Sequence, residues 1–263
     1  MERIFPNFSP RTTSGAKVIV NTPGSWRLEI PPGSEGHYRL AQIDDYASLP
    51  RRLFPWQAPF SISLQMRASA QDIPGTWGFG LWNDPFSLSL GLGGGTRHLP
   101  VLPNAAWFFF ASPKNYLSIY DNLPASDSLA ATFCSKSWST TQHTLAAVSI
   151  PFIFLAPLAR LLRRMARLYV FQDAAQLSLV LTDWHFYEIQ WQPDKVIFLV
   201  DQEVVLQTQV IPVGRMGLVL WVDNQYFSFP ASGRLAYGTL TNPETTWIEI
   251  KQLVCLTILS QTR

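Results

Sequence analysis

Residues 182–206 read TDWHFYEIQWQPDKVIFLVDQEVVL, and this stretch decides the fold. From Trp184 to Trp191, and again from Lys195 to Asp201, apolar and polar side chains alternate, which is typical of β-strands with one buried face. Asp201 and Gln202 then lead into a third apolar run, as in a tight hairpin, although glycine is the usual residue at position 202 of such a turn. The stretch therefore predicts consecutive antiparallel strands.

The same alternation recurs along the whole chain between 20 prolines and 15 glycines, which are scattered and do not gather into a linker. No period of 20–50 residues repeats, so a repeat architecture is not indicated. Many short strands separated by turns favour a β-sandwich, and we expect residues 1–263 to form a single domain. Further strands are expected over Phe60 to Arg67, Trp77 to Trp82, Ala106 to Ala111, Met216 to Asp223 and Trp247 to Leu253.

The composition excludes several classes of protein. Of the 263 residues, 47% are hydrophobic and 14% charged, against roughly 25% charged in an average soluble domain, so the chain is not disordered. A net charge of +2 is too balanced to indicate a nucleic-acid partner. The two cysteines, Cys134 and Cys255, cannot form a disulfide framework, and residues 1–6 lack the features of a signal peptide. We therefore expect a cytoplasmic protein.

One segment, Thr144 to Gln172, departs from the strand pattern, and we expect a helical insertion at about 140–172. From Pro157 to Tyr169, one helical stripe is apolar and the opposite face carries Arg160, Arg163, Arg164 and Arg167. The simplest interpretation is a helix that packs its apolar stripe on the sandwich and leaves its arginines in water. A contact with an anionic membrane surface, a lid and an oligomer contact remain alternatives for Pro157 to Tyr169.

Residues 182–201 resemble the penultimate hairpin of family 16 glycoside hydrolases, whose members often read H-x-Y-x-I-x-W-x-P-D before an apolar strand. Two further stretches, Phe60 to Trp82 and Trp247 to Leu253, are similar to the same template. The resemblance implies the concanavalin A-like fold: an all-β jelly-roll sandwich of two curved antiparallel sheets with a groove along the concave face. Here it would carry the amphipathic helical insertion.

The catalytic signature of that family is absent from the resembling strand. Members carry acids spaced E-x-D-x-x-E or E-x-D-x-E, because retaining cleavage needs two carboxyl groups about 5–5.5 Å apart. The corresponding strand here, Asn104 to Ala111, contains no carboxylate. We therefore expect that the chain does not hydrolyse glycans by the family's double-displacement route, and the sequence leaves open whether it is an enzyme. Asp84 and Asp223 are the catalytic candidates that remain.

Alternation on three strands suggests a ligand-binding surface. It places Phe79 and Leu81 on a core face and the glycines at 78 and 80 opposite, with Trp82 after them, as on the floor of an open groove. Aromatic rings beside carboxyl and amide groups suit a sugar, because the ring stacks and the polar groups fix hydroxyls. The expected ligand-binding residues are Trp82, Asp84, Trp107, Trp221, Asp223 and Asn224.

Alternative functions remain open at this stage. The tryptophans could instead fill the core, or line an apolar groove for a lipid-like small molecule in a repurposed glucanase fold with cyclase- or isomerase-like activity. A divergent glycoside hydrolase is a further alternative. Four histidines show no zinc spacing, and turn chemistry explains Asp44, Asp45, Asp121 and Asp127 better than calcium binding, so we expect no metal and no cofactor.

Overall fold

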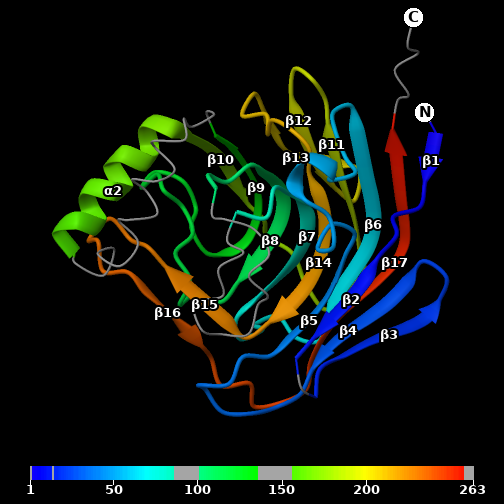
Figure 1. Ribbon diagram of the computed structural model, residues 1–263. Coiled ribbons are helices and arrows are strands. Elements are labelled where there is room, and N and C mark those ends of the chain that lie inside the picture. Colours follow the sequence, from blue (N-terminus) through cyan, green and yellow to red (C-terminus); the bar gives the residue numbers. More distant parts are fainter. Residues whose placement is uncertain (1, 14, 86–100, 136–155, 258–263) are drawn as a thin grey trace, which may run out of the picture.

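The computed structural model describes residues 2–13, 15–85, 101–135 and 156–257. Within these residues the chain forms two large antiparallel sheets stacked face to face, and the helix α2 lies outside the second sheet (Figure 1). The predicted all-β jelly-roll sandwich is therefore confirmed. The part of the predicted insertion at 140–155 lies outside the described residues.

The first sheet, sheet A, has the strand order β13-β12-β11-β6-β17-β4-β3, and β1 (Glu2–Ile4) pairs with β17. It contains the stretch on which the fold prediction rests, since β11 and β12 pair in antiparallel register and the turn at 201–202 joins β12 to β13. The strands of sheet A are β13 (Glu203–Thr208), β12 (Val196–Val200), β11 (His185–Trp191), β6 (Phe60–Ala68), β17 (Thr246–Thr257), β4 (Ser25–Ile30) and β3 (Lys17–Thr22).

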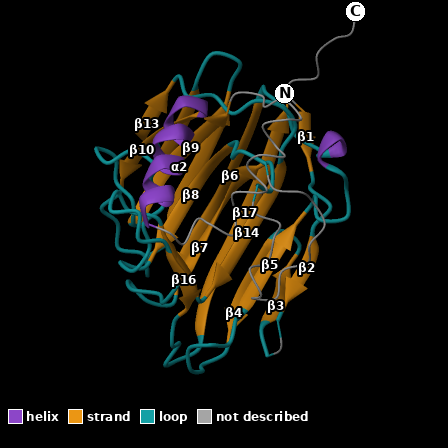
Figure 2. Ribbon diagram, turned by 60° about the vertical axis from the view of Figure 1, so that its left-hand side comes forward, coloured by secondary structure: helices purple, strands orange, loops and turns teal. Residues whose placement is uncertain are grey.

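The second sheet, sheet B, has the order β10-β9-β8-β7-β14-β5-β2. A separate hairpin of β15 (Gln225–Ser228) and β16 (Ala236–Thr239) follows β14 and lies with α2 on the side of sheet B that faces away from sheet A (Figures 1 and 2). The strands of sheet B are β10 (Val170–Gln176), β9 (Asp127–Ser135), β8 (Ala105–Ala111), β7 (Thr76–Trp82), β14 (Gly217–Asp223), β5 (Leu40–Asp44) and β2 (Ser9–Thr12).

The main core lies between the two sheets. Strand β6 alternates buried and partly exposed residues along its whole length, as a strand with one face on a core must. From sheet B, Phe79, Leu81 and Leu220 face the same core, as the sequence predicts. Cys255 is fully buried there, as expected for a small core residue. The opposite face of sheet B, here called the concave face, carries a second apolar cluster.

Helix α2 (Ala156–Tyr169) is amphipathic, but its orientation differs from the prediction. Arg163 is only 2% exposed, whereas Leu168 is 65% exposed. Arg163 donates hydrogen bonds to the carbonyl oxygens of Ser118 and Phe229, 2.7 and 2.6 Å away, and pairs with Asp121 at 2.6 Å. The expectation that all the arginines lie in water is therefore wrong, because two backbone carbonyl groups and a carboxylate of the domain bind the buried Arg163.

Candidate functional site on the concave face of sheet B

The glycines of β7 lie directly opposite tryptophans of the neighbouring strands. Gly80 pairs with Trp107 on β8, and Gly78 pairs with Trp221 on β14. A Cβ atom at Gly80 would lie 2.4 Å from the Trp107 Cβ, and one at Gly78 would lie 2.2 Å from the Phe108 carbonyl oxygen. Strand β7 therefore needs glycine at both positions, because the backbone of its neighbours occupies the space.

Within the described part of the chain, tryptophan rings fill the space over these glycines, where an open groove is expected. Trp82, Trp107 and Trp221, here called the indole cluster, share the concave face as alternation predicts. Trp107 and Trp221 are each only 8% exposed. The ring centroid of Trp107 lies 6.0 Å from that of Trp82 and 6.2 Å from that of Trp221. The cavity beside Trp107 has a volume of about 10 Å³, roughly that of one water molecule. The indole rings themselves occupy the expected groove.

Asp223 lies at the end of β14 with its carboxylate turned into the protein. Its Oδ1 accepts hydrogen bonds from the backbone N–H of Thr76 at 3.2 Å, from the Thr76 hydroxyl at 2.8 Å and from the N–H of Gln225 at 3.1 Å. The Tyr38 hydroxyl donates to Oδ2 at 3.3 Å. Burial raises the pKa of Asp223 to about 7. The carboxyl group thus joins strands β7 and β14 and has no contact left for a ligand.

Asn224 and Asp84 also have structural roles, since both take part in hydrogen bonds that hold the backbone in place. Asn224 is fully buried, accepts a hydrogen bond from the Arg39 N–H at 2.8 Å, and donates to the carbonyl oxygens of His37 and Leu240. Asp84 has a positive φ of 50° just beyond β7, and its carbonyl oxygen accepts a hydrogen bond from Arg51 at 2.5 Å. Asn224 therefore joins the backbone of residues 37–39 to that of Leu240. Asp84 shapes the turn that follows Trp82.

Tyr46, which no sequence pattern singles out, packs against the exposed end of the indole cluster. Its ring meets Trp82 edge to face at 6.0 Å and lies over Gly217, where a Cβ atom would come within 2.2 Å of the tyrosine ring. The Tyr46 hydroxyl and the Trp82 Nε1 are both buried at this corner, and burial raises the pKa of Tyr46 well above its usual value. Tyr46 therefore joins the indole cluster to the turn that begins at Asp44.

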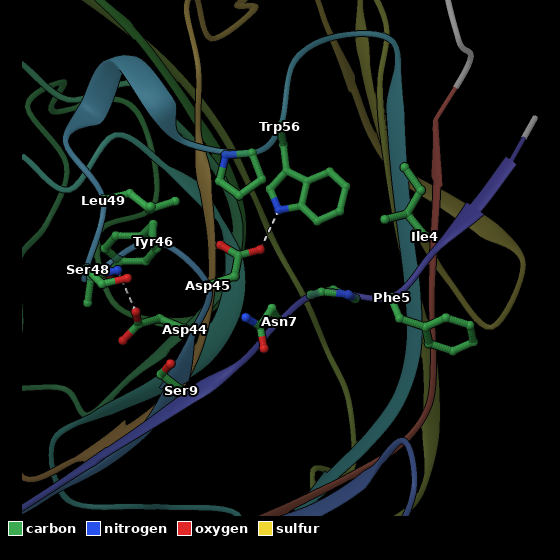
Figure 3. Close-up of a pocket in the computed structure, with 13 residues that line it drawn as sticks. Ile4, Phe5, Asn7, Ser9, Asp44, Asp45, Tyr46, Ser48, Leu49 and Trp56 are labelled. Atoms are coloured by element: carbon green, nitrogen blue, oxygen red, sulfur yellow. Dashed lines mark hydrogen bonds between the residues drawn. The ribbon is translucent and has the colours of Figure 1, made fainter.

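A pocket of about 270 Å³ opens beside Tyr46 (Figure 3). Three segments line it: residues 4–7 with Ser9, the turn 44–49, and Pro55 with Trp56. The Trp56 indole forms one wall and donates a hydrogen bond from Nε1 to Asp45 Oδ2 at 2.6 Å, while Asn7 lies across the hollow from Asp45 (Figure 3). The pocket therefore combines aromatic walls with carboxyl, amide and hydroxyl groups.

Hydrogen bonds within the protein hold both acids of the pocket in place. Asp44 accepts hydrogen bonds from Gln42 Nε2 at 2.7 Å and from the Ala47 N–H at 2.8 Å. Asp45 accepts from the Leu218 N–H at 2.9 Å, and burial raises its pKa to about 7. Among the residues that the structure describes, no three His, Cys, Asp or Glu side chains are grouped to hold a metal ion.

Asp44 and Asp223 lie far apart along the concave face of sheet B. Asp44 pairs with Val219, and Asp223 lies four residues further along the same strand and on the same face. At about 3.3 Å per residue, the backbone positions of the two acids are roughly 13 Å apart along the strand direction. Retaining cleavage needs about 5–5.5 Å and inverting cleavage about 6.5–9.5 Å. This pair therefore fits neither geometry.

The model of a known protein family matches a short part of the chain, from β10 to just beyond β13. Residues 172–211 match the family model of glycosyl hydrolases family 16. The match begins in β10 and runs through β11, β12 and β13, which includes the residues that carry the resemblance noted in the sequence. That resemblance is thus confirmed for a short part of the chain. No curated protein matches the chain.

Several solved structures are similar to the chain at low sequence identity. A legume lectin-like domain from Entamoeba histolytica has 8% identity and a TM-score of 0.49, with 96% of this chain and 90% of that chain covered. An endo-1,3-β-glucanase domain from Thermotoga petrophila has 8% identity and a TM-score of 0.48, covering 98% and 95%. The κ-carrageenase of Pseudoalteromonas carrageenovora has 13% identity and a TM-score of 0.48, covering 92% and 81%. None of these likenesses bears on the ligand of this chain.

Proposed function

We propose that the protein binds a carbohydrate, or another ring-bearing polar ligand, in the pocket beside Tyr46. The observation that carries the proposal is the lining of this pocket, where the Trp56 and Tyr46 rings, 5 and 1% exposed, lie beneath the more exposed side chains of Asp45, Asn7 and Ser48. Aromatic rings stack on the apolar face of a sugar, and a few polar groups fix its hydroxyls.

The size of the pocket favours a small ligand or the end of a longer one. Its volume of about 270 Å³ is just below the roughly 300–1,000 Å³ typical of small-molecule sites. The indole cluster then supports the pocket from behind, through the contact between Trp82 and Tyr46. The proposal thus keeps the ligand class expected from the sequence and moves the ligand from the floor of sheet B to its edge.

The test is a glycan array followed by a titration of the recognised glycan, with intrinsic fluorescence as the readout. Asn7 is exposed, so Asn7→Ala should leave the fold intact and weaken binding by about 0.5–1.5 kcal/mol, the usual contribution of one hydrogen bond. Trp56→Phe should weaken binding as well, because it removes part of the wall and the hydrogen bond to Asp45.

Two matched controls accompany these variants. Trp191→Phe also alters a buried indole, but in the core between the sheets, and should leave binding unchanged. Asn122→Ala removes an exposed amide away from the pocket lining. A wild-type protein that recognises no glycan, or pocket variants that bind as the wild type does, would refute the proposal.

Two alternative functions, the binding of a lipid-like ligand and the hydrolysis of a glycan, would need other features in the structure. A lipid-like ligand needs an apolar cavity, and the one beside Trp107 holds about 10 Å³. A hydrolase needs two carboxyl groups at cleavage distance, and the backbone positions of Asp44 and Asp223 are roughly 13 Å apart by their register. Native mass spectrometry that reveals a copurified apolar molecule would favour the first. Release of reducing sugar from β-glucans, lost in Asp84→Asn or Asp223→Asn, would favour the second.

A further inference from the structure

The outer side of α2 carries a row of apolar side chains in contact with solvent. Leu161, Met165 and Leu168 are 51, 47 and 65% exposed. Their spacing of four and three residues places them on one line along the helix. Single exposed apolar side chains are common on protein surfaces. Three apolar side chains in a row on one helix face form an exposed apolar patch, which is typical of a surface that binds a partner or a membrane.

The contacts of Arg163 and Arg167 keep this row turned outward. Arg163 is buried against the carbonyl oxygens of Ser118 and Phe229, and Arg163 and Arg167 both pair with Asp121. A helix held only by apolar packing would bury its leucines. Here charged hydrogen bonds fix the rotation of α2, so the apolar row cannot turn toward sheet B without breaking them.

Positive charge flanks the exposed row. Arg160 and Arg164 are exposed on the helix, and neither forms an ion pair within the described part of the chain. Arg234 is exposed one residue after Gly233, which lies against Arg160. The helix contains no acidic residue, and the carboxylate beside it, Asp121, is already paired with Arg163 and Arg167. The surface is therefore apolar along its centre and basic along its side.

We propose that α2 docks the protein on an anionic lipid surface, lying parallel to the membrane. Leu161, Met165 and Leu168 would enter the boundary between headgroups and acyl chains, while Arg160 and Arg164 would contact lipid phosphates. Figures 1 and 2 show α2 at the periphery of the molecule, outside sheet B. No described helix is long and apolar enough to cross a membrane.

The test is flotation with vesicles of phosphatidylcholine alone and with vesicles that also contain phosphatidylglycerol. The wild-type protein should float with the anionic vesicles at low salt and remain at the bottom with neutral ones or at high salt. Leu161→Ser or Leu168→Ser should lower the partition coefficient about tenfold, since each removes one buried apolar side chain. Arg160→Glu or Arg164→Glu should lower it about fivefold or more.

The control variants change equivalent residues elsewhere on the surface. Val204→Ser removes an apolar side chain that is 58% exposed on β13, and Arg52→Glu reverses an exposed charge in the short helix η1 (Arg51–Leu53). Both should float as the wild type does. Absence of flotation with phosphatidylglycerol, or equal losses in the control variants, would overturn the proposal. A dimer in solution that Leu161→Ser dissociates, without any flotation, would instead assign the row to a second copy of the chain.

Discussion

The carboxyl group of Asp223 meets four hydrogen-bond donor contacts and almost no solvent. These hydrogen bonds favour the charged form, but burial penalises it more and raises the pKa to about 7. The unfolded chain keeps a value near 3.8. Between these two values the folded protein holds a proton that the unfolded chain has released, so the free energy of unfolding falls as pH rises from about 4 to about 7.

The Asp223→Asn variant should therefore be less sensitive to pH. Its amide can still accept the hydrogen bonds from Thr76 and Gln225, while its NH₂ group can donate to the Tyr38 oxygen. Urea unfolding at pH 5 and pH 8 should show a loss on the order of a few kcal/mol in the wild type and a smaller loss in the variant. Asp45 contributes the same sign of dependence, so some slope remains.

Replacement of an exposed acid supplies the control for this experiment. Asp194→Asn removes a carboxylate from the exposed turn between β11 and β12 and should keep the full difference between pH 5 and pH 8. If Asp223→Asn also keeps the full difference, the buried carboxyl group does not carry the pH dependence.

At the scale of the element, the turn between β12 and β13 has an unusual second residue. Asp201 and Gln202 have φ values of 50° and 72°, so both lie in the left-handed region that a two-residue type I′ turn requires. Glycine adopts this region without the steric cost that glutamine bears. Gln202→Gly should therefore raise the free energy of unfolding by about 0.5–1 kcal/mol, measured by urea denaturation.

The same change within a strand should have the opposite sign. Gln207 is exposed on β13, and Gln207→Gly should lower stability by about 0.5–1 kcal/mol, because glycine loses more backbone freedom on folding. Equal effects at positions 202 and 207 would show that the conformation of the turn is not the cause.

The attachment of α2 gives a second prediction at this scale. Arg163→Ala leaves the carbonyl oxygens of Ser118 and Phe229 without their donor, so it should cost about 3 kcal/mol of unfolding free energy. Asp121 is 46% exposed, and its ion pair with Arg163 adds little to this figure. Arg164→Ala, at an exposed position on the same helix, should change stability by less than about 0.5 kcal/mol in the same assay. A loss in Arg163→Ala as small as that in Arg164→Ala would rule out the buried contacts as the attachment.

At the scale of the whole molecule, alternation predicts the strands well because most of them have one buried face. The predicted strand from Phe60 to Arg67 matches β6 to within one residue. Strand β8 (Ala105–Ala111) is different, since all its residues are buried between the main core and the second apolar cluster. A strand covered on both faces carries no alternation of polarity from which its surroundings could be derived.

The site could be predicted only in part, because it depends on which strands are neighbours. Alternation correctly places Trp82, Trp107 and Trp221 on one face. It cannot show that the rings of Trp107 and Trp221 lie opposite Gly80 and Gly78, since strand order and register decide that pairing. The pocket beside Tyr46 joins three distant segments, and the partners of Arg163 are backbone carbonyl groups. Neither contact leaves a pattern in the sequence.

The close packing of the indole cluster has an optical consequence. Rings whose centroids lie 6.0 and 6.2 Å apart are near enough for their electronic transitions to couple through space. Circular dichroism of the tryptophan bands sums over all tryptophans of the chain, and the coupling within the indole cluster contributes to it. A movement of β7 against β8 or β14 should change this contribution. The tryptophan bands can therefore be used to follow structural changes on the concave face of sheet B.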